Sequence, residues 1–471
     1  MTALAPVQLE AIAQANGRRG YAYYMEMGLG KSLTTLTEFK ALRMSGVVER
    51  LVVICPNSFK GGWSSEIMKH RTGLSAMIFE SGKKFEPSKS IDVLIINYEA
   101  VRTAKGIEAI LKFINWGQRP CYLAIDESIK LKNRNSKQTQ SIIGKLYKGE
   151  MRGGIVRMFN FVRVLSGKPI TQGPHDLWPQ IVAIGEMSMS YFGFQKQYCR
   201  LGGWMDKQVV GVLNEKDLQE KLTKVAFQAK KRDWLKGLPP KLYSTRRYSL
   251  TGAIARHYDE MEEDFLTYLK GEVVSVQIAL SKYEKLAQIQ CGFIIKENRE
   301  VEWLVEPEHN SRLLLLQEIL DEEVSGKAVI VYRHKAVGDL LYKALAQEHA
   351  RVAWIHGGMT TLAIDVEKLK FEKQNCPLML LQADAGKYGH TLVGTPEDPC
   401  GTMLFFENTY SLDTRSQIED RIHRMGTVAE SCLYVDLSGS DIDERITRAL
   451  QRKQNMFEAV FPEVQFQKEA A

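Results

Sequence analysis

A short glycine-rich segment near the N-terminus has the composition of a phosphate-binding loop. Gly28-Leu29-Gly30-Lys31-Ser32 follows an apolar run and precedes a helical pattern over 33–43. Glycines let backbone N–H groups approach phosphate oxygens, and a helix N-terminus adds a favourable dipole. Lys31 would reach the β- and γ-phosphates, and the Ser32 hydroxyl would ligate Mg²⁺. The strict pattern has glycine at position 25, where this chain has Met25, so the segment alone is also compatible with a chance glycine turn.

Two adjacent acids provide a second candidate for nucleotide chemistry. Asp126-Glu127 ends the apolar run 122–125, which has the composition of a buried parallel strand. Such a strand places both carboxylates at its carboxyl edge, where open α/β sheets bind ligands. There Asp126 would hold Mg²⁺ through water, and Glu127 would orient and deprotonate the attacking water. An isolated Asp-Glu pair is more often a solvated turn, but the loop at 28–32 in the same chain favours the catalytic interpretation.

The elements that would position these residues form two series. Up to about residue 240, and again from about 310, short apolar strands alternate with amphipathic helices, as in parallel α/β sheets. The strands expected are 20–25, 51–55, 93–97, 122–125 and 162–166 in the first series, and 328–332, 351–355, 378–382, 403–407 and 433–437 in the second. The zone between them, 215–308, is polar and largely helical in pattern. We therefore predict an α/β protein with two parallel-sheet lobes joined by a helical bridge. The limits expected are 1–245 for the first lobe, with a helical protrusion at about 180–235, 246–308 for the bridge and 309–471 for the second lobe.

Composition argues against membrane, secreted and fibrous proteins. The 471 residues are 44% hydrophobic and 25% charged, which is ordinary for a globular protein. No apolar run approaches the ~18–20 residues of a membrane span, and no secretory signal is evident. Seven dispersed cysteines without a C-x-x-C pair predict buried thiols in a reducing compartment. The net charge of +7 is compatible with a polyanionic partner.

The order of the motifs resembles the Swi/Snf-type branch of superfamily 2 helicases, which are ATP-driven translocases on double-stranded DNA. The matching segments of the first half are Pro6-Val7-Gln8, 26–32, 53–56 with Trp63 and Glu66, Asn97-Tyr98-Glu99, Asp126-Glu127 with Lys132-Asn133, 165–170 with Leu177-Trp178, and Lys231-Arg232 before Leu238-Pro239-Pro240-Lys241. Those of the second half are 327–332, Ile355-His356-Gly357, 385–392 and 417–426. The last segment closely matches Q-x-x-D-R-x-H-R-x-G and is the most specific match in the chain.

The resemblance implies two RecA-like lobes that bind Mg²⁺-ATP between them. Arg421 and Arg424 would then reach the γ-phosphate, where a guanidinium stays charged and spreads several donors over the developing negative charge. The residues expected to bind the nucleotide are Gln8 at the adenine, Gly28, Leu29, Gly30, Lys31, Ser32, Gly389 and Gln417. DNA contacts are expected from segments 56–63, 97–103, 354–358 and 385–391, mostly to phosphates and with little base specificity.

Three segments depart from the family pattern. Lys168 stands where the family has threonine, in a segment thought to couple hydrolysis to movement, and would lie near Asp126-Glu127 or near a DNA backbone. Ser128-Ile129 replaces Ala-His, and Gln382-Ala383-Asp384 replaces a small, hydroxyl-rich entry to the motif at 385–392.

Two basic segments allow more than one interpretation. The aromatic and basic stretch from Tyr191 to Lys207, which includes Trp204, is compatible with a base-stacking element, but such stretches more often pack beneath a lobe. Lys230-Lys231-Arg232 would either contact phosphate or form a solvated helix face.

The leading hypothesis is an ATP-dependent DNA translocase or helicase acting on duplex or branched DNA. A chain of this size suggests a monomeric bacterial or phage protein of the cytoplasm, acting in replication, recombination or repair without a membrane partner. Two alternatives stay open: an RNA-directed helicase, and a DNA-binding protein that uses ATP as a switch and hydrolyses it weakly.

Overall fold

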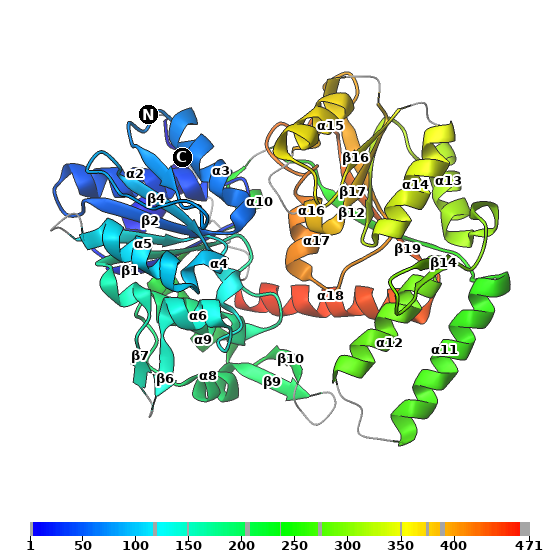
Figure 1. Ribbon diagram of the computed structural model, residues 1–471, viewed down its shortest axis with the longest axis horizontal. Helices are drawn as coiled ribbons and strands as arrows, with labels where there is room; N and C mark the ends of the chain where they lie inside the picture. The colour runs from blue at the N-terminus through cyan, green and yellow to red at the C-terminus, as the bar shows by residue number, and fades with distance from the viewer. Residues whose placement is uncertain are drawn as a thin grey trace, which may run out of the picture. The chain divides into compact units, whose positions relative to one another are not determined.

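The chain folds into two compact units, each built on one parallel sheet. The computed structural model describes residues 3–115, 120–147, 150–202, 208–235, 237–271, 276–348, 351–373, 376–386 and 391–461. Contacts group Met1–Lys236 with Arg452–Ala471 in the first unit and Gly237–Gln451 in the second. Figure 1 labels many of the helices and strands of both units.

The first unit contains a seven-stranded sheet whose strand pairs are all parallel. The strands β1, β2 and β5 are apolar runs that are buried along their whole length, as expected when helices cover both faces of a sheet. In sheet order they are β11 (Ala226–Ala229), β1 (Gly20–Met25), β8 (Phe161–Ser166), β5 (Cys121–Ile125), β2 (Arg50–Cys55), β4 (Val93–Asn97) and β3 (Ala76–Ile78).

Alternate side chains of these strands enter two separate cores. Tyr21, Tyr23 and Met25 of β1 pack on one face of the sheet, whereas Ala22 and Tyr24 pack on the other. The helices of the first face are α1 (Pro6–Ala15), α2 (Lys31–Met44) and α3 (Lys60–Lys69). Those of the second face are α4 (Tyr98–Val101), α5 (Ala104–Asn115), α6 (Lys137–Ile143), α7 (Trp178–Ala183), α8 (Tyr191–Tyr198), α9 (Glu215–Val225) and the end of α18 (Asp441–Val460). Two hairpins, β6 (Lys145–Tyr147) with β7 (Glu150–Arg152) and β9 (Cys199–Gly202) with β10 (Gln208–Val212), and the short α10 (Lys231–Trp234) complete the unit.

The second unit contains a six-stranded sheet, also parallel throughout. Its order is β12 (Lys241–Arg247), β19 (Cys432–Ser438), β18 (Cys400–Phe405), β15 (Lys327–Tyr332), β17 (Leu378–Gln382) and β16 (Val352–Ile355). One face carries α13 (Ser311–Glu322) and α14 (Lys335–Glu348), and the other carries α15 (Thr361–Lys373), α16 (Ala383–Gly386) and α17 (Leu412–Glu419). The long helices α11 (Gly252–Gly271) and α12 (Val276–Ile289) pack side by side, followed by the hairpin β13 (Phe293–Ile295) and β14 (Val301–Trp303).

The α/β fold class with two RecA-like parallel-sheet lobes is confirmed. All ten expected strands are present, and most of their ends agree within a residue, although β18 begins three residues earlier than expected. The expectation of a largely helical zone over 215–308 was wrong in part, because β11, β12 and the β13–β14 hairpin lie within it. β11 has four residues and β12 is a polar edge strand, so neither carries the apolar run that marks a buried strand. The expected domain limits stay a prediction.

All seven cysteines are buried free thiols, as predicted. In the part of the chain that the structure describes, no helix is both long enough and apolar enough to cross a bilayer.

Candidate active site

The glycine-rich segment forms the turn between β1 and α2. Gly30 adopts a left-handed conformation, with φ of 81°, immediately before the first residue of the helix. The first N–H groups of α2 therefore lie where a phosphate would bind. The ammonium of Lys31 donates to the carbonyl oxygen of Met25 at 2.9 Å, so its side chain is folded back over the loop.

Gln8 of α1 holds this loop from the side. Its amide oxygen accepts from the Ala5 N–H at 3.0 Å, and its amide nitrogen donates to the Leu29 carbonyl at 3.2 Å. A Cβ added to Gly30 would lie 2.1 Å from that amide nitrogen. The expected adenine-binding residue therefore packs directly on the expected phosphate loop.

The two acids follow β5, and the structure buries both of them. Oδ2 of Asp126 accepts a 2.8 Å hydrogen bond from the indole N–H of Trp63, and its Oδ1 accepts from the Glu127 N–H at 2.9 Å. Burial raises the pKa of Asp126, and the Trp63 hydrogen bond and the charge of Lys31 oppose that rise. The hydroxyl of Tyr98 donates to the Asp126 carbonyl at 2.7 Å. The same hydroxyl lies 3.3 Å from the Glu127 carbonyl, so side chains of the two expected DNA-contact segments hold this acid pair.

Glu127 has a strained backbone. Its φ is 49°, in the left-handed region that non-glycine residues rarely occupy. Such strain gathers at functional sites, where the surrounding structure over-determines it. The alternative interpretation, a solvated Asp-Glu turn, does not fit because both acids are buried.

The sheet order brings the loop and the acids to one edge. β1, β8 and β5 are neighbours, so their carboxyl ends lie side by side. The turn after β8 reaches the loop directly, because a Cβ on Gly167 would lie 3.3 Å from the Met27 nitrogen and 3.6 Å from the ammonium of Lys31. Ligands of open α/β sheets bind at such an edge.

A further contact of the loop could not be read from the sequence. The carboxylate of Glu26 accepts from the backbone N–H of Lys231 at 2.7 Å, although the two residues are 205 positions apart. Lys231 is buried, and its Cε would lie 3.7 Å from a Cβ on Gly28. Lys231 therefore belongs to the wall of the phosphate loop and not to a solvated helix face.

The second unit gathers the other expected nucleotide residues at the end of α17. Arg421 is 1% exposed, and its Nε donates to the carbonyl oxygen of Gln417 at 2.7 Å. Arg424 is half-buried. A ring nitrogen of His423 lies 3.0 Å from the carbonyl oxygen of Pro239, which joins this turn to the Leu-Pro-Pro-Lys segment. Gly389 lies outside the described residues.

Glu419 is the centre of a buried charge cluster beside these arginines. It accepts from Lys241 at 3.1 Å, from the hydroxyl of Tyr243 at 2.8 Å and from Arg415 at 2.8 Å. Burial alone would raise the pKa of Glu419, but the charges of Lys241 and Arg415 outweigh it and lower the pKa to about 2. The edge strand β12, which begins at Lys241, is thereby fixed to the turn that carries Arg421 and Arg424.

The family model of the SNF2-related domain matches residues 19–301, which is more than half of the chain. The chain belongs to the SNF2-related family. A relative in Saccharomyces cerevisiae, the ISWI chromatin-remodeling complex ATPase ISW2, is 22% identical over 91% of this chain and 38% of its own length. The human DNA annealing helicase and endonuclease ZRANB3 is 21% identical over 96% of this chain and 40% of its own length.

This SNF2-related chain therefore spans about two fifths of the length of those two relatives. Among solved structures, the SWI2/SNF2 ATPase core of Sulfolobus solfataricus in complex with dsDNA aligns with a TM-score of 0.43 and 20% identity. That alignment covers 98% of this chain and 93% of the other.

The departures from the SNF2 pattern have local structural roles. Ser128 donates to Gln180 at 2.7 Å, and Ile129, in place of histidine, is buried in the first unit. The side chain of Gln382 accepts from the Gly357 N–H at 2.7 Å and donates to the Arg333 carbonyl at 3.0 Å. Lys168 was expected near Asp126-Glu127 or a DNA backbone. Its ammonium instead donates to the side chain of Gln454 in α18 at 2.7 Å.

The aromatic stretch of this SNF2-related chain divides between core and surface. Phe194 and Tyr198 are buried in the first unit, with ring centroids 4.8 Å apart. Phe192 is exposed, and the guanidinium of Arg134 lies 4.9 Å from its ring. Trp204 and Lys207 lie outside the described residues.

The oxygen groups at the sheet edge fit a magnesium ion bound together with nucleotide. Ser32 offers a hydroxyl in the first turn of α2, and Asp126 offers a carboxylate whose Lys31 and Trp63 neighbours favour the charged form. Hard oxygen ligands, few from protein and several from water and phosphate, are typical of Mg²⁺. No cluster of three or more His, Cys, Asp or Glu side chains suited to a metal occurs among residues whose placement is described.

Proposed function

We propose that this protein hydrolyses Mg²⁺-ATP and uses the energy to move along duplex DNA. The observation that carries the proposal is the meeting of Lys31, Asp126 and Glu127 at one sheet edge in a chain of the SNF2-related family. The names of relatives contain the words ATPase, helicase and chromatin-remodeling, which supports both ATP and DNA as ligands.

Each residue has a role that follows from its position. Lys31, released from the Met25 carbonyl, would bind the β- and γ-phosphates. Mg²⁺ held by Ser32 and Asp126 would neutralise charge on the phosphates when bound. Glu127 would take the proton of the attacking water, and its fixed backbone would hold the carboxylate in one direction.

The two arginines of the second unit differ in what they could do. The Nε of Arg421 is bonded to the carbonyl of Gln417, and its guanidinium is almost entirely buried. Arg424 is half-buried and so better suited to reach a ligand. We therefore assign Arg424 to the γ-phosphate and Arg421 to shaping the turn on which Arg424 sits.

Steady-state ATPase assays test the proposal. Turnover is measured alone and with single-stranded DNA, linear duplex, forked DNA and RNA, in the intact chain and in Lys31→Ala and Glu127→Gln. Lys40→Ala and Glu108→Gln are matched controls, because Lys40 lies on the same helix but bonds to the Thr72 carbonyl, and Glu108 pairs with Lys112 on the surface. Duplex-stimulated turnover that both site variants abolish and both controls retain is the expected result.

Other outcomes separate the alternatives. Stimulation by RNA and not by DNA would make the protein an RNA-directed enzyme. ATP binding without stimulation by any nucleic acid would make it a nucleotide switch. Stronger stimulation by forked than by linear DNA would support action on branched DNA. Equal stimulation by both would contradict a preference for branched DNA. A bacterial or phage setting and a monomeric state stay predictions from the sequence.

A further inference from the structure

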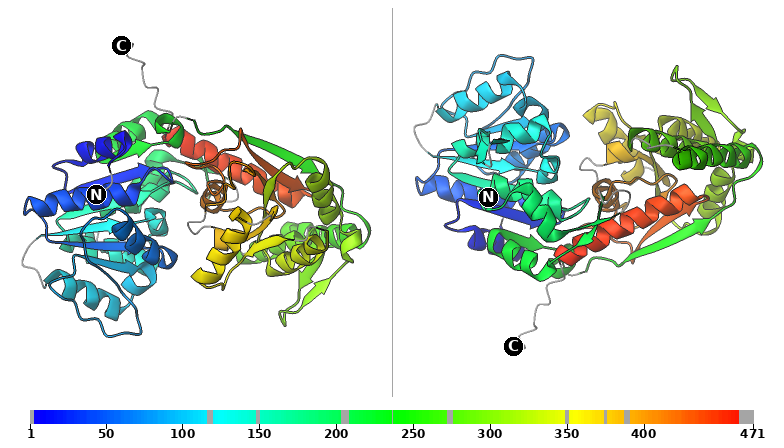
Figure 2. Two further views of the ribbon diagram at one scale, coloured as in Figure 1. Left: turned by 90° about the horizontal axis from the view of Figure 1, so that it is seen from above. Right: turned by 90° about the horizontal axis from the view of Figure 1, so that it is seen from below.

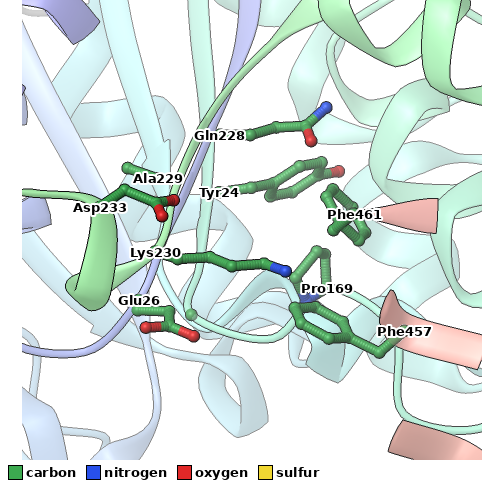
Figure 3. A pocket seen from close by; sticks show the side chains of 10 residues that line it. Tyr24, Glu26, Pro169, Gln228, Ala229, Lys230, Asp233, Phe457 and Phe461 are labelled. Atoms are coloured by element: carbon green, nitrogen blue, oxygen red, sulfur yellow. The ribbon is translucent and has the colours of Figure 1, made fainter. Parts of the chain in front are cut away.

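The last turns of α18 are an integral part of the first unit. Met456, Phe457, Val460 and Phe461 are buried in the same core as Tyr24 of β1. The rings of Phe461 and Tyr24 meet edge to face, with centroids 5.7 Å apart (Figure 3). The same helix begins in the second unit, where Ile442 and Ile446 pack against α11 and α12 (Figure 2 shows α18 in red as one continuous helix).

Lys168 makes a polar contact between this helix end and the turn after β8. Its ammonium donates to Oε1 of Gln454 at 2.7 Å and lies 5.1 Å from the centre of the Phe457 ring. Lys230 approaches the same ring, at 5.9 Å, and Figure 3 shows its side chain directed toward Phe457 and Pro169. The lysine that departs from the family pattern is thus matched by an amide and an aromatic ring of the C-terminal helix.

The residue before Lys168, Gly167, lies beside the phosphate loop. A Cβ on Gly167 would lie 3.3 Å from Met27 and 3.6 Å from the ammonium of Lys31, so only a side-chain-free residue leaves that space open, and the Lys168 N–H donates to the Ser166 hydroxyl at 3.2 Å. A shift of the 166–168 turn would therefore move the wall against which the Lys31 ammonium rests. Small misplacements of a catalytic group lower turnover more than they lower binding.

We propose that Lys168 is a positioning residue through which docking of the end of α18 controls ATP turnover. With Gln454 and Phe457 in place, the 166–168 turn is held against Lys31, and when the helix end leaves, the turn loses this support. The C-terminal helix is then a built-in activator of the first unit. The inference rests on the proposed ATP hydrolysis for its kinetic part, but not for its docking part.

The test compares Lys168→Thr, which restores the family residue, with Lys168→Arg, which keeps the charge. Lys221→Thr is the matched control, because Lys221 also bonds to a polar side chain and lies over a ring, that of Tyr198, on the surface of α9. Amide hydrogen exchange of residues 453–461 reports docking, and kcat and KM for ATP report the site. Loss of one charged hydrogen bond and one cation–π contact is expected to lower protection by about tenfold in Lys168→Thr.

In the same variant kcat is expected to fall several-fold while KM for ATP changes little, and Lys168→Arg and Lys221→Thr should retain both values. Unchanged protection in Lys168→Thr would overturn the docking role. Reduced protection with unchanged kcat would overturn the positioning role. Should the intact chain bind ATP without turnover, the proposed function fails by itself. Nucleotide-induced protection of residues 26–32 then replaces kcat as the readout, and equal protection in Lys168→Thr and the intact chain would overturn the inference.

Discussion

The indole nitrogen of Trp63 donates a hydrogen bond to the buried carboxylate of Asp126. Trp63 lies in the 56–63 segment and Tyr98, which bonds to the Asp126 carbonyl, lies in the 97–103 segment. The family resemblance assigns both segments to DNA. Each therefore carries one side chain to Asp126 of the proposed ATP site, which would give DNA binding a direct physical route to the groups proposed to act on ATP.

Trp63→Phe is expected to lower DNA-stimulated turnover by about tenfold, because a hydrogen bond to a charged group contributes roughly 1.5–3 kcal/mol. The lost donor also raises the pKa of Asp126 further, since burial already raises it and Trp63 opposes that effect. The acidic limb of the pH–rate profile should then move to higher pH. Trp178→Phe is the control, because its indole donates to the neutral Met189 carbonyl. An acidic limb at the same pH in Trp63→Phe would show that Trp63 does not influence the ionisation of Asp126 during turnover.

Gly30 and Gly28 should respond differently to alanine, although both have positive φ, of 81° and 88°. A left-handed alanine costs about 1–2 kcal/mol in either place. At Gly30 the new Cβ would also meet the Gln8 amide at 2.1 Å, whereas at Gly28 its nearest neighbour is the Lys231 Cε at 3.7 Å. The Gln8 amide ends a flexible side chain and can move aside at the cost of its hydrogen bond to Leu29, so Gly30→Ala should lower the free energy of unfolding by roughly 1 kcal/mol more than Gly28→Ala, measured by urea denaturation. Adding Gln8→Ala to both variants should remove that difference. Equal losses in Gly30→Ala and Gly28→Ala with Gln8 present would show that the loop adjusts to the new Cβ without cost.

The sequence was sufficient for ten strands of the two sheets because those strands are continuous apolar runs, whereas β3, β11 and β12 were not predicted. The run at 122–125 predicted β5 and, through it, the position of Asp126 and Glu127. The polar strand β12 carries no such signal, since its pairing with β19 depends on residues nearly 200 positions away. An edge strand needs no apolar face, so periodicity cannot distinguish it from a loop.

The residues missed by sequence reasoning are partners that meet across the fold. Glu26 and Lys231 were both within recognised motifs, but nothing in either motif states that one bonds to the other. Lys168 was noticed as a departure, and its partner Gln454 is 286 positions away. Motifs identify groups that contact a ligand, whereas contacts between protein groups depend on the packing of distant elements.

Lys241→Met should destabilise the second unit by about 3 kcal/mol, because it leaves Glu419 buried with one less cation. The pKa of Glu419 is about 2 in the folded chain against 4.5 for a free glutamate, so its stabilisation is present above pH 4.5 and is lost as pH falls toward 2. The variant should begin to unfold at higher pH in an acid titration followed by circular dichroism. Arg246 lies on the same strand as Lys241 and forms an exposed ion pair with Glu323. Arg246→Met should therefore lower the free energy of unfolding by less than about 1 kcal/mol. Equal effects of the two variants would show that the buried cluster is not the stronger contact.

His334 should make the second unit less stable in mild alkali. The imidazole lies between Glu407 and Glu284, and although burial lowers its pKa, the two carboxylates outweigh burial and raise the pKa to about 9. A raised histidine pKa stabilises the fold below pH 6.5, the unfolded value, and this stabilisation is lost as pH rises through 9. The urea midpoint of the intact chain should therefore fall between pH 6.5 and 9.5. In His334→Gln, which keeps a hydrogen-bonding side chain without the charge, the midpoint should be lower at pH 6.5 and nearly flat with pH. His257→Gln, at an exposed histidine 3.5 Å from Glu260, should behave like the intact chain. A fall of the same size in His334→Gln would assign the alkaline loss to other groups.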